Sequence, residues 1–216
     1  MTSSRPVNQF SKPTGWFGRY TLWRMNSYHS KLTDWGLQHA TIERHFTILD
    51  VGCGGGRTVS KLATITTQGK VYGIDHSDES VAATRRLNAR WIRAGRVELL
   101  HGSVSHLPFS GDMFDLVTAV ETHFFWPDLP ADLREVWRVL KPGGTLLIVS
   151  EAYKGAKKIA GNLAERYVPS EGMKLLTVNE HRELFAKAGY VEVQIVENPD
   201  IGWICATGRK AKADSC

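Results

Sequence analysis

Short apolar segments alternate with amphipathic stretches through the first two thirds of the chain. Five of these segments are rich in β-branched residues and have little polar alternation, which is typical of strands buried on both faces of a parallel sheet. They are residues 46–51, 71–75, 97–100, 114–120 and 145–149. Most of the stretches between them read as helices that would cover such a sheet. The pattern therefore predicts an α/β fold.

Apolar residues at helical spacing predict three further helices. The first lies within residues 16–46. The second spans 129–140 and is ended by the Pro-Gly-Gly of 142–144. The third begins with a capping box at Thr177 and ends at Gly189. In the first helix the periodic positions are Leu32, Trp35, His39 and Ile42.

The last third of the chain has a different pattern. Residues 191–196 and 202–207 alternate between apolar and polar side chains, and the short connection between them suits an antiparallel hairpin. The expected sheet thus has seven strands. We expect residues 1–45 to form an N-terminal arm and helices, and 46–208 to form one domain. Within that domain 151–176 is expected to be an insertion above the sheet, and 209–216 to follow as a basic tail.

Length and composition agree with one compact domain, since the chain has 216 residues of which 42% are hydrophobic. No apolar run approaches the ~20 residues that span a bilayer, and the polar N-terminus has no signal-peptide core. The three cysteines are an odd number at irregular spacing, which predicts neither a disulfide framework nor a metal site. These features predict a cytoplasmic protein without a membrane segment.

The formal net charge is +5, which raises the question of a nucleic-acid partner. The basic residues are spread along the chain, with small groups at 85–86, 157–158 and 209–212. None of these groups forms a long stripe with interleaved aromatic residues, the pattern of single-strand binders. We interpret them as solvated helix faces and a basic tail, and do not expect nucleic acid as a partner.

A glycine-rich segment directly follows the first predicted strand. Residues 50–56 read Asp-Val-Gly-Cys-Gly-Gly-Gly, and a helical pattern begins at Arg57. Glycine permits a sharp turn and the close approach of a ligand to the backbone. The N–H groups at the start of the following helix attract anionic groups such as a carboxylate. The segment therefore predicts a ligand-binding loop.

The spacing of this loop narrows the choice of ligand. A dinucleotide site has G-x-G-x-x-G, but Arg57 occupies the position of the third glycine. No Gly-Lys-Ser/Thr follows, so this is not a phosphate loop. Asp75 ends the next strand, 19 residues after Gly56, where a carboxylate can accept both hydroxyls of a ribose. Each part alone has an ordinary explanation as a turn or helix cap, but together they predict a nucleoside site.

From residue 48 to 63 the chain resembles the first motif of class I S-adenosylmethionine-dependent methyltransferases, acidic-x-G-x-G-x-G. Residues 72–75, 102–109, 114–117 and 138–144 resemble the later motifs in order, and the similarity covers roughly residues 46–208. The resemblance implies a doubly wound, Rossmann-like sheet of seven strands. It implies a mostly parallel sheet with an antiparallel C-terminal hairpin and helices on both faces. It also implies S-adenosylmethionine as cofactor and S-adenosylhomocysteine as product.

The resemblance also implies which residues hold the cofactor. Asp50, Gly52 and Gly54 would serve its methionine end, with Cys53 in the same loop, and Asp75 would bind its ribose. The remaining cofactor residues are His76 near the adenine, Ser103 and Val104 at the adenine edge, and Glu121. Many family members carry Asp where this chain has Ser103, which shifts the expected adenine contact toward the backbone N–H of Val104.

Chemistry is expected after the fourth strand, because ligands bind at the carboxyl ends of strands in open α/β sheets. Methyl transfer is a direct displacement that depends mainly on alignment and exclusion of water. Glu121 is a candidate to approach the sulfonium or the amino group, and His123 is a candidate base or acceptor-orienting group. Phe124, Phe125 and Trp126 are candidate walls of an acceptor pocket. Core packing is the alternative for the histidine and the aromatics.

The N-terminal region is the second candidate for acceptor contacts. It holds more aromatic residues and polar donors than a plain surface helix needs, and small-molecule members of the family often use such helices as a lid. Our candidates are Tyr20, Met25, Asn26 and His29. An ordinary amphipathic helix packed on the sheet explains the pattern equally well.

The acceptor class follows from what the chain lacks. The Asn/Asp-Pro-Pro-Tyr/Phe tetrapeptide of base-amino methylases is absent after residue 120, which argues against methylation of adenine or cytosine amino groups. Residues 121–123 resemble instead the small-molecule branch of the family, so the expected partner is a small-molecule methyl acceptor. The alternatives are methylation of RNA or protein, and a cofactor-binding partner subunit without turnover. A nicotinamide-dependent oxidoreductase is disfavoured by Arg57. We expect a monomer or a homodimer.

Overall fold

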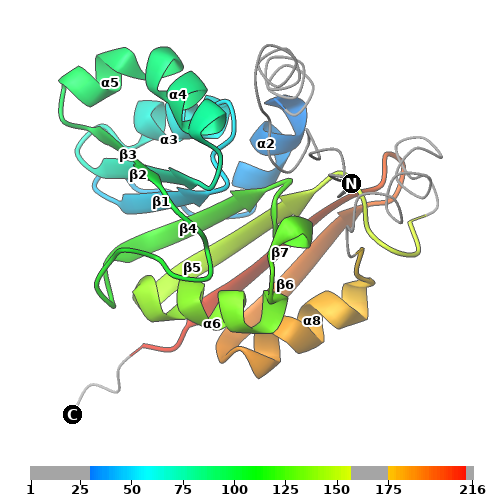
Figure 1. The fold of residues 1–216 in the computed structure, drawn as a ribbon. Helices are drawn as coiled ribbons and strands as arrows, with labels where there is room; N and C mark the ends of the chain where they lie inside the picture. Colours follow the sequence, from blue (N-terminus) through cyan, green and yellow to red (C-terminus); the bar gives the residue numbers. More distant parts are fainter. Residues whose placement is uncertain (1–29, 157–174, 213–216) are drawn as a thin grey trace, which may run out of the picture.

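The computed structural model describes residues 30–156 and 175–212. A seven-stranded sheet in the order β3-β2-β1-β4-β5-β7-β6 runs through its centre (Figure 1). Strands β1 to β5 pair in parallel, whereas β7 is antiparallel to both β5 and β6. The strands are β1 Thr47–Val51, β2 Lys70–Asp75, β3 Val97–His101, β4 Phe114–Val120, β5 Leu140–Ser150, β6 Tyr190–Asn198 and β7 Trp203–Lys210. The predicted sheet with its C-terminal hairpin is confirmed.

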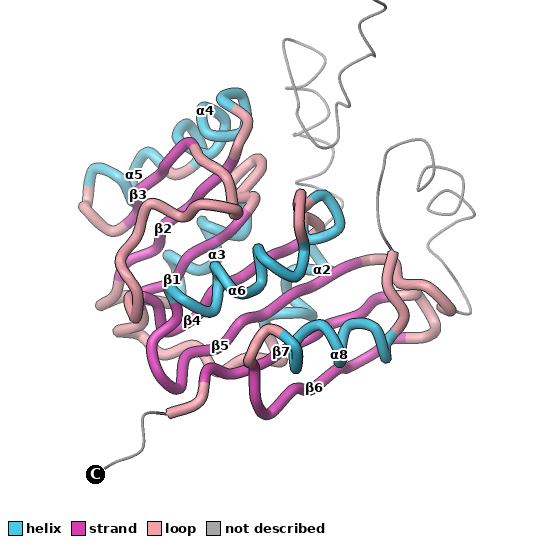
Figure 2. Tube along the Cα trace, turned by 60° about the horizontal axis from the view of Figure 1, so that its bottom comes forward, coloured by secondary structure: helices cyan, strands magenta, loops and turns pink. Residues whose placement is uncertain are grey.

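Helices cover both faces of this sheet. Helices α6 and α8 lie on one face, and α2, α3, α4 and α5 lie on the other (Figure 2). Neighbouring strand residues point to opposite faces, so that Leu49 packs into the core under α6 and Ile48 into the core under α3. The helices are α2 Ser30–Leu37, α3 Arg57–Ile65, α4 Asp78–Leu87, α5 Ala89–Arg93, α6 Leu129–Val139 and α8 Val178–Lys187. The doubly wound arrangement is thus confirmed.

The junction between α6 and β5 differs from the sequence prediction. Helix α6 ends at Val139, and β5 begins at Leu140 without a loop between them. The residue opposite Leu140 in the sheet is Phe114 of β4. Strand pairing therefore begins before the Pro-Gly-Gly of 142–144, so these breakers lie inside the first part of the strand.

Helix α2 ends earlier than its periodicity suggested, because its last residue is Leu37 and it excludes His39 and Ile42. Three successive i→i+3 backbone hydrogen bonds, accepted by the carbonyls of residues 35–37, tighten the chain beyond the helix. Gly36 lies against β5, where a Cβ atom would be 2.4 Å from Cγ2 of Val149. The absence of a side chain at Gly36 therefore allows α2 to approach the sheet closely.

The last strand is longer than the sequence pattern predicted. Strand β7 continues to Lys210 rather than ending at residue 207. The Lys210 ammonium is 2.7 Å from a carboxylate oxygen of Asp112 and 4.0 Å from the centre of the Trp137 ring.

The capping box of α8 is present as predicted, since Thr177 and Glu180 bond each other's backbone N–H.

Some expectations fall on parts of the chain that the structure does not describe. These are most of the N-terminal arm, residues 157–174 of the predicted insertion and residues 213–216 of the tail. Within 30–156 and 175–212, none of the helices is long and apolar enough to cross a bilayer.

Candidate functional site

A cavity of about 250 Å³ lies at the carboxyl ends of β1, β2 and β4. The chain leaves β1 toward β2 and β3 on one side and returns to β4 on the other, so this is the topological switch point of the sheet. The loops that follow these strands form its walls. The predicted site residues that line it are Asp50, Gly52, Cys53, Gly54, Asp75, His76, Ser103, Val104, Glu121 and Trp126.

The glycine loop is held against the end of β2. The N–H groups of Gly52 and Cys53 both donate to the carbonyl of Ile74, at 2.8 and 3.1 Å. Gly52 has φ +71°, and a Cβ there would lie 2.2 Å from the hydroxyl oxygen of Thr122. Gly54 has φ +52° but no close neighbour, since the nearest atom to a Cβ would be 3.9 Å away. Packing therefore requires glycine at position 52, while glycine at 54 leaves space beside the cavity.

Asp75 ties this loop to the start of α4. One of its carboxylate oxygens accepts the N–H of Gly54 and the other accepts the N–H of Ser77, both at 2.9 Å. Burial raises the pKa of Asp75, and these two backbone donors oppose that rise. The carboxylate is thus fixed in position at the cavity, where it can accept a hydroxyl of a bound nucleoside.

Asp50 lies at the floor of the cavity and is 2% exposed. Burial raises its pKa to about 7, the nearby Asp75 adds to the rise, and a hydrogen bond from Thr118 opposes it. The Thr118 hydroxyl donates to Asp50 Oδ1 at 2.7 Å. Two carboxylates with little solvent around them favour a ligand that brings positive charge.

Cys53 and His76 flank this acidic pair. Burial raises the pKa of the Cys53 thiol, and the two neighbouring carboxylates raise it further. The side chain therefore packs as a neutral thiol, 3.8 Å from the hydroxyl of Thr84. His76 is exposed, and its Nδ1 lies 3.8 Å from Oδ1 of Asp75.

The loop after β3 contributes Ser103 and Val104 to the cavity. Ser103 closes its own turn, since its hydroxyl accepts the N–H of Ser105 at 3.2 Å and its carbonyl accepts the N–H of His106 at 3.3 Å. Val104 is 7% exposed. The backbone of this loop, rather than a charged side chain, is what it offers to a ligand.

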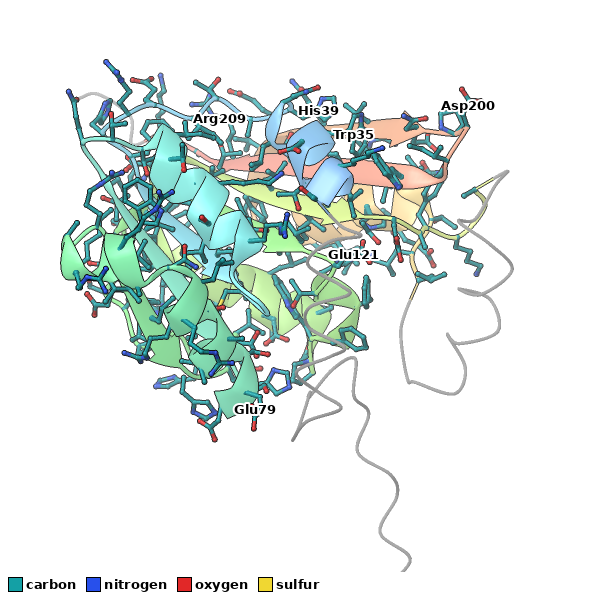
Figure 3. The ribbon with its side chains drawn as sticks, turned by 90° about the horizontal axis from the view of Figure 1, so that it is seen from above. Trp35, His39, Glu79, Glu121, Asp200 and Arg209 are labelled. Atoms are coloured by element: carbon teal, nitrogen blue, oxygen red, sulfur yellow. The ribbon has the colours of Figure 1, made fainter. Side chains whose placement is uncertain are left out.

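Glu121 follows β4 in an unusual backbone conformation. Its φ is 57°, in the left-handed region that residues other than glycine rarely adopt. Its N–H donates to the carbonyl of Val149 at 2.9 Å, and its Oε1 accepts the N–H of Glu151. Glu121 therefore joins the ends of β4 and β5. In Figure 3 it lies away from Trp35 and His39 of the α2 region.

His123 and Phe124 are corrections to the sequence prediction, because neither lines the cavity. Both lie in the short 3-10 helix His123–Phe125 and are buried. The His123 ring lies 5.5 Å from the ring of His181 on α8, and burial, followed by the charge of that neighbour, lowers its pKa to about 3. With so low a pKa and no contact with the cavity, His123 is a weak base and is not placed to take a proton from an acceptor bound there.

The aromatic wall is instead formed by the next residues along the chain. Phe125, Trp126 and Pro127 line the cavity. A 3-10 helix has three residues per turn, so successive side chains point in different directions and only the last of the three reaches this wall. Of the three aromatic residues expected at this wall, Phe125 and Trp126 line the cavity and Phe124 does not.

Sequence reasoning missed several residues that line the cavity. Thr33 reaches it from α2 and is 4% exposed, and no local signal in the sequence marks it. Arg57 and Thr58 begin α3, which has no acidic residue in its first turn and no side-chain cap. A basic residue at such a helix start is a readable signal for an anionic ligand group.

The predicted lid residues Tyr20, Met25, Asn26 and His29 lie outside the described residues. Among the residues that are described, no three or more His, Cys, Asp or Glu side chains are grouped to hold a metal ion.

Known proteins resemble this chain in sequence. A family model described as a methyltransferase domain matches residues 49–148. An uncharacterized methyltransferase of Bacillus subtilis, YdaC, is 25% identical over 189 residues, which cover 86% of this chain and 95% of that protein. A demethylmenaquinone methyltransferase of Geobacillus kaustophilus is 26% identical over 199 residues, covering 80% of this chain and 84% of that protein.

Solved structures share the fold. A SAM-dependent methyltransferase from Aquifex aeolicus superposes with a TM-score of 0.70 at 21% identity, over 88% of this chain and 97% of that one. A chain of the complex between the Haloferax volcanii Trm112 methyltransferase activator and the putative methyltransferase superposes with a TM-score of 0.76 at 21% identity. That match covers 89% of this chain and 94% of the other.

Proposed function

We propose, given that this chain belongs to the class I S-adenosylmethionine-dependent methyltransferases, that it methylates a small organic acceptor bound beside Phe125, Trp126 and Pro127. The observation that carries this proposal is the position of that apolar wall, which lines the same cavity as the glycine loop and Asp75. Aromatic and apolar walls are typical of pockets for small molecules. A relative named for demethylmenaquinone supports an acceptor of this size and character.

We assign the nucleoside end of the cofactor to the β2 side of the cavity. Asp75 would accept the ribose hydroxyls, and His76 would lie beside the adenine. Ser103 and Val104 would form the adenine edge, with the backbone N–H of Val104 as the expected donor. The fixed carboxylate of Asp75, 2.9 Å from the N–H of Gly54, supports this assignment.

The methionine end would lie over the glycine loop. Asp50, Gly52, Cys53 and Gly54 form the floor of this part, and the open space beside Gly54 suits close approach of a ligand. Arg57 and the uncapped start of α3 would attract the carboxylate group of the cofactor. Its amino group and sulfonium would be favoured by the acidic residues on the other side.

The cofactor would supply an electrophilic methyl group, so the protein needs mainly to orient the acceptor and to exclude water. Glu121 is our candidate to stabilise positive charge at the end of β4, and Trp126 our candidate to position the acceptor. Because His123 is buried away from the cavity, we do not propose it as a base. An acceptor with a hydroxyl nucleophile would need a proton-accepting group from another part of the site.

Calorimetry with S-adenosylhomocysteine and with NAD tests the cofactor assignment. We expect micromolar binding of the first and none of the second. Asp75→Ala should weaken S-adenosylhomocysteine by about 100-fold, since it removes a charged acceptor of two hydrogen bonds. Asp78→Ala is the matched control, because that carboxylate lies three residues away and its side chain is 93% exposed. Unchanged binding by Asp75→Ala would contradict the role of Asp75 in binding the cofactor.

The acceptor class needs a turnover assay. We expect small aromatic or prenylated metabolites to stimulate release of S-adenosylhomocysteine, and Trp126→Ala to raise the KM for such an acceptor more than that for the cofactor. Stimulation by RNA or protein alone would contradict the small-molecule assignment.

A second candidate is methylation of RNA or protein, or a subunit without turnover of its own. It is favoured by the similarity to a chain solved with a methyltransferase activator and by the net charge of +5. Binding of RNA that weakens steeply with added salt would support this candidate.

A further inference from the structure

The loop 102–109 between β3 and β4 must hold a defined shape without regular structure of its own. Gly102, Ser103 and Val104 of this loop line the cavity. In our proposed function these residues face the adenine, so the affinity of the cofactor depends on where the loop backbone lies. Contacts from other elements must therefore set its position.

Two side chains of α6 make such contacts. Oε1 of Glu135 accepts the N–H of Leu107 at 2.8 Å. The Arg138 guanidinium donates to the carbonyl of Phe109 at 2.8 Å and to that of Leu107 at 3.1 Å. Three hydrogen bonds thus connect one turn of α6 to the backbone of the loop.

The same two side chains also hold each other. Arg138 donates through Nε and Nη2 to the two oxygens of Glu135, both at 2.8 Å. These bonds lower the pKa of Glu135 and raise that of Arg138, so both groups are charged. The side chains are 18% and 40% exposed, so the attraction itself contributes little to stability. Its planar two-bond geometry is more important, because it fixes the direction of the remaining donors and acceptors.

A short turn connects Leu107 with the residues of the loop that line the cavity. The N–H of His106 donates to the carbonyl of Ser103 at 3.3 Å, which places Leu107 just beyond the turn that contains Val104. Leu107 is 2% exposed. Arg138 is itself close to the sheet, since its carbonyl accepts the N–H of Asp112 and β5 begins two residues later. The pair therefore links the sheet to the wall of the cavity.

We infer that Glu135 and Arg138 are positioning residues that set the backbone of loop 102–109 for the adenine of the cofactor, without touching the cofactor themselves. This inference rests on the proposed function. Apolar packing is the competing explanation for the loop's shape. Phe109 makes edge contacts with Tyr72 and Phe114, at ring distances of 5.5 and 4.9 Å, and these alone would anchor the end of the loop.

The test compares three ligands on wild type, Glu135→Ala, Arg138→Ala and the conservative Glu135→Gln. S-adenosylhomocysteine carries both ends of the cofactor, 5′-methylthioadenosine carries the adenine end, and S-ribosylhomocysteine lacks the base. We expect each alanine variant to bind the first two about tenfold more weakly, by the same factor, as one or two lost hydrogen bonds predict. Binding of S-ribosylhomocysteine should be unchanged. Glu135→Gln retains an acceptor for Leu107 and should lose less.

Asp115→Asn is the matched control. Asp115 pairs with Lys141 at 2.8 Å, and the two side chains are 18% and 39% exposed, close to the values of the α6 pair. Asp115 bonds the N–H of Thr47 rather than the loop. We expect this variant to lower the Tm as the α6 variants do, but to leave every dissociation constant unchanged.

Two results would overturn the inference. One is a lower Tm for the α6 variants with no change in affinity for either adenine-containing ligand. The other is an equal loss for S-ribosylhomocysteine, which would indicate a general disturbance of the site. Failure of wild type to bind S-adenosylhomocysteine would instead refute the proposed function. At saturating cofactor the turnover number of the variants should remain within about twofold of wild type, while their KM for the cofactor rises as the dissociation constant does.

Discussion

Replacement of Asp50 by Asn should make the stability of the protein less sensitive to rising pH. Asp50 is 2% exposed, and burial raises its pKa from 3.8 to about 7 in the folded state. A folded state with the higher pKa holds the proton more tightly than the unfolded chain. The wild type therefore loses stability as the pH rises from about 3.8 to about 7, whereas Asn carries no proton to lose.

The size of the effect follows from the two pKa values. Ionisation of Asp50 lowers the free energy of unfolding by about 4 kcal/mol once Asp50 is ionised in both the folded and the unfolded state. At pH 5 much of this loss has not yet occurred. Relative to Asp50→Asn, the wild type should lose about 3 kcal/mol between pH 5 and pH 8. Comparing slopes rather than absolute stabilities removes the cost of burying the amide, which does not depend on pH.

Urea unfolding of both proteins without ligand, at half-unit steps from pH 5 to 8, measures this difference. Thr118→Val provides an internal comparison, because it removes the hydrogen bond that opposes the rise in the pKa of Asp50. We expect it to increase the same dependence on pH. Parallel stability curves for wild type and Asp50→Asn would refute the reasoning, since they would mean that Asp50 is not desolvated in the folded protein.

Two further substitutions test the environment of the site. Gly52→Ala should lower the free energy of unfolding by about 2 kcal/mol or more, because φ is +71° and the new Cβ would meet Thr122; equal urea midpoints for variant and wild type would contradict this. His123 has a pKa of about 3 when folded and 6.5 when unfolded, so its contribution is lost as the pH falls below 6.5. From pH 8 to pH 4 the free energy of unfolding of the wild type should fall by about 3 kcal/mol relative to that of His123→Leu. Chemical unfolding at both pH values measures this, and an equal change in the two proteins would contradict the prediction.

Most strands could be predicted because their sequence signal is local. A parallel strand buried on both faces is a short apolar run, and the length and β-branched residues of segments such as 114–120 favour a strand over a buried helix. The glycine loop is equally local, since the turn at residues 52–56 depends on backbone conformations that its own glycines supply. Spacing and strand order connected this loop with Asp75, and the resemblance to a family added the loop after β3.

What escaped prediction depends on partners far away in the sequence. The close approach of α2 to β5 depends on Gly36 against Val149, and the buried His123 ring packs beside His181 of α8. The start of β5 depends on pairing with Phe114 rather than on the Pro-Gly-Gly that follows. Periodicity assigns a residue to a face, but it does not identify the element that covers that face.

Gly36 also influences the width of the cavity. It lies one helical turn from Thr33, which lines the cavity from α2, and its missing side chain determines how near that helix sits to β5. Alanine or serine at position 36 would push against Val149, and the relief of that contact would move α2 outward together with Thr33. Residue 36 is thus a place from which protein engineering can widen the pocket and alter its selectivity while every group that contacts a ligand is retained.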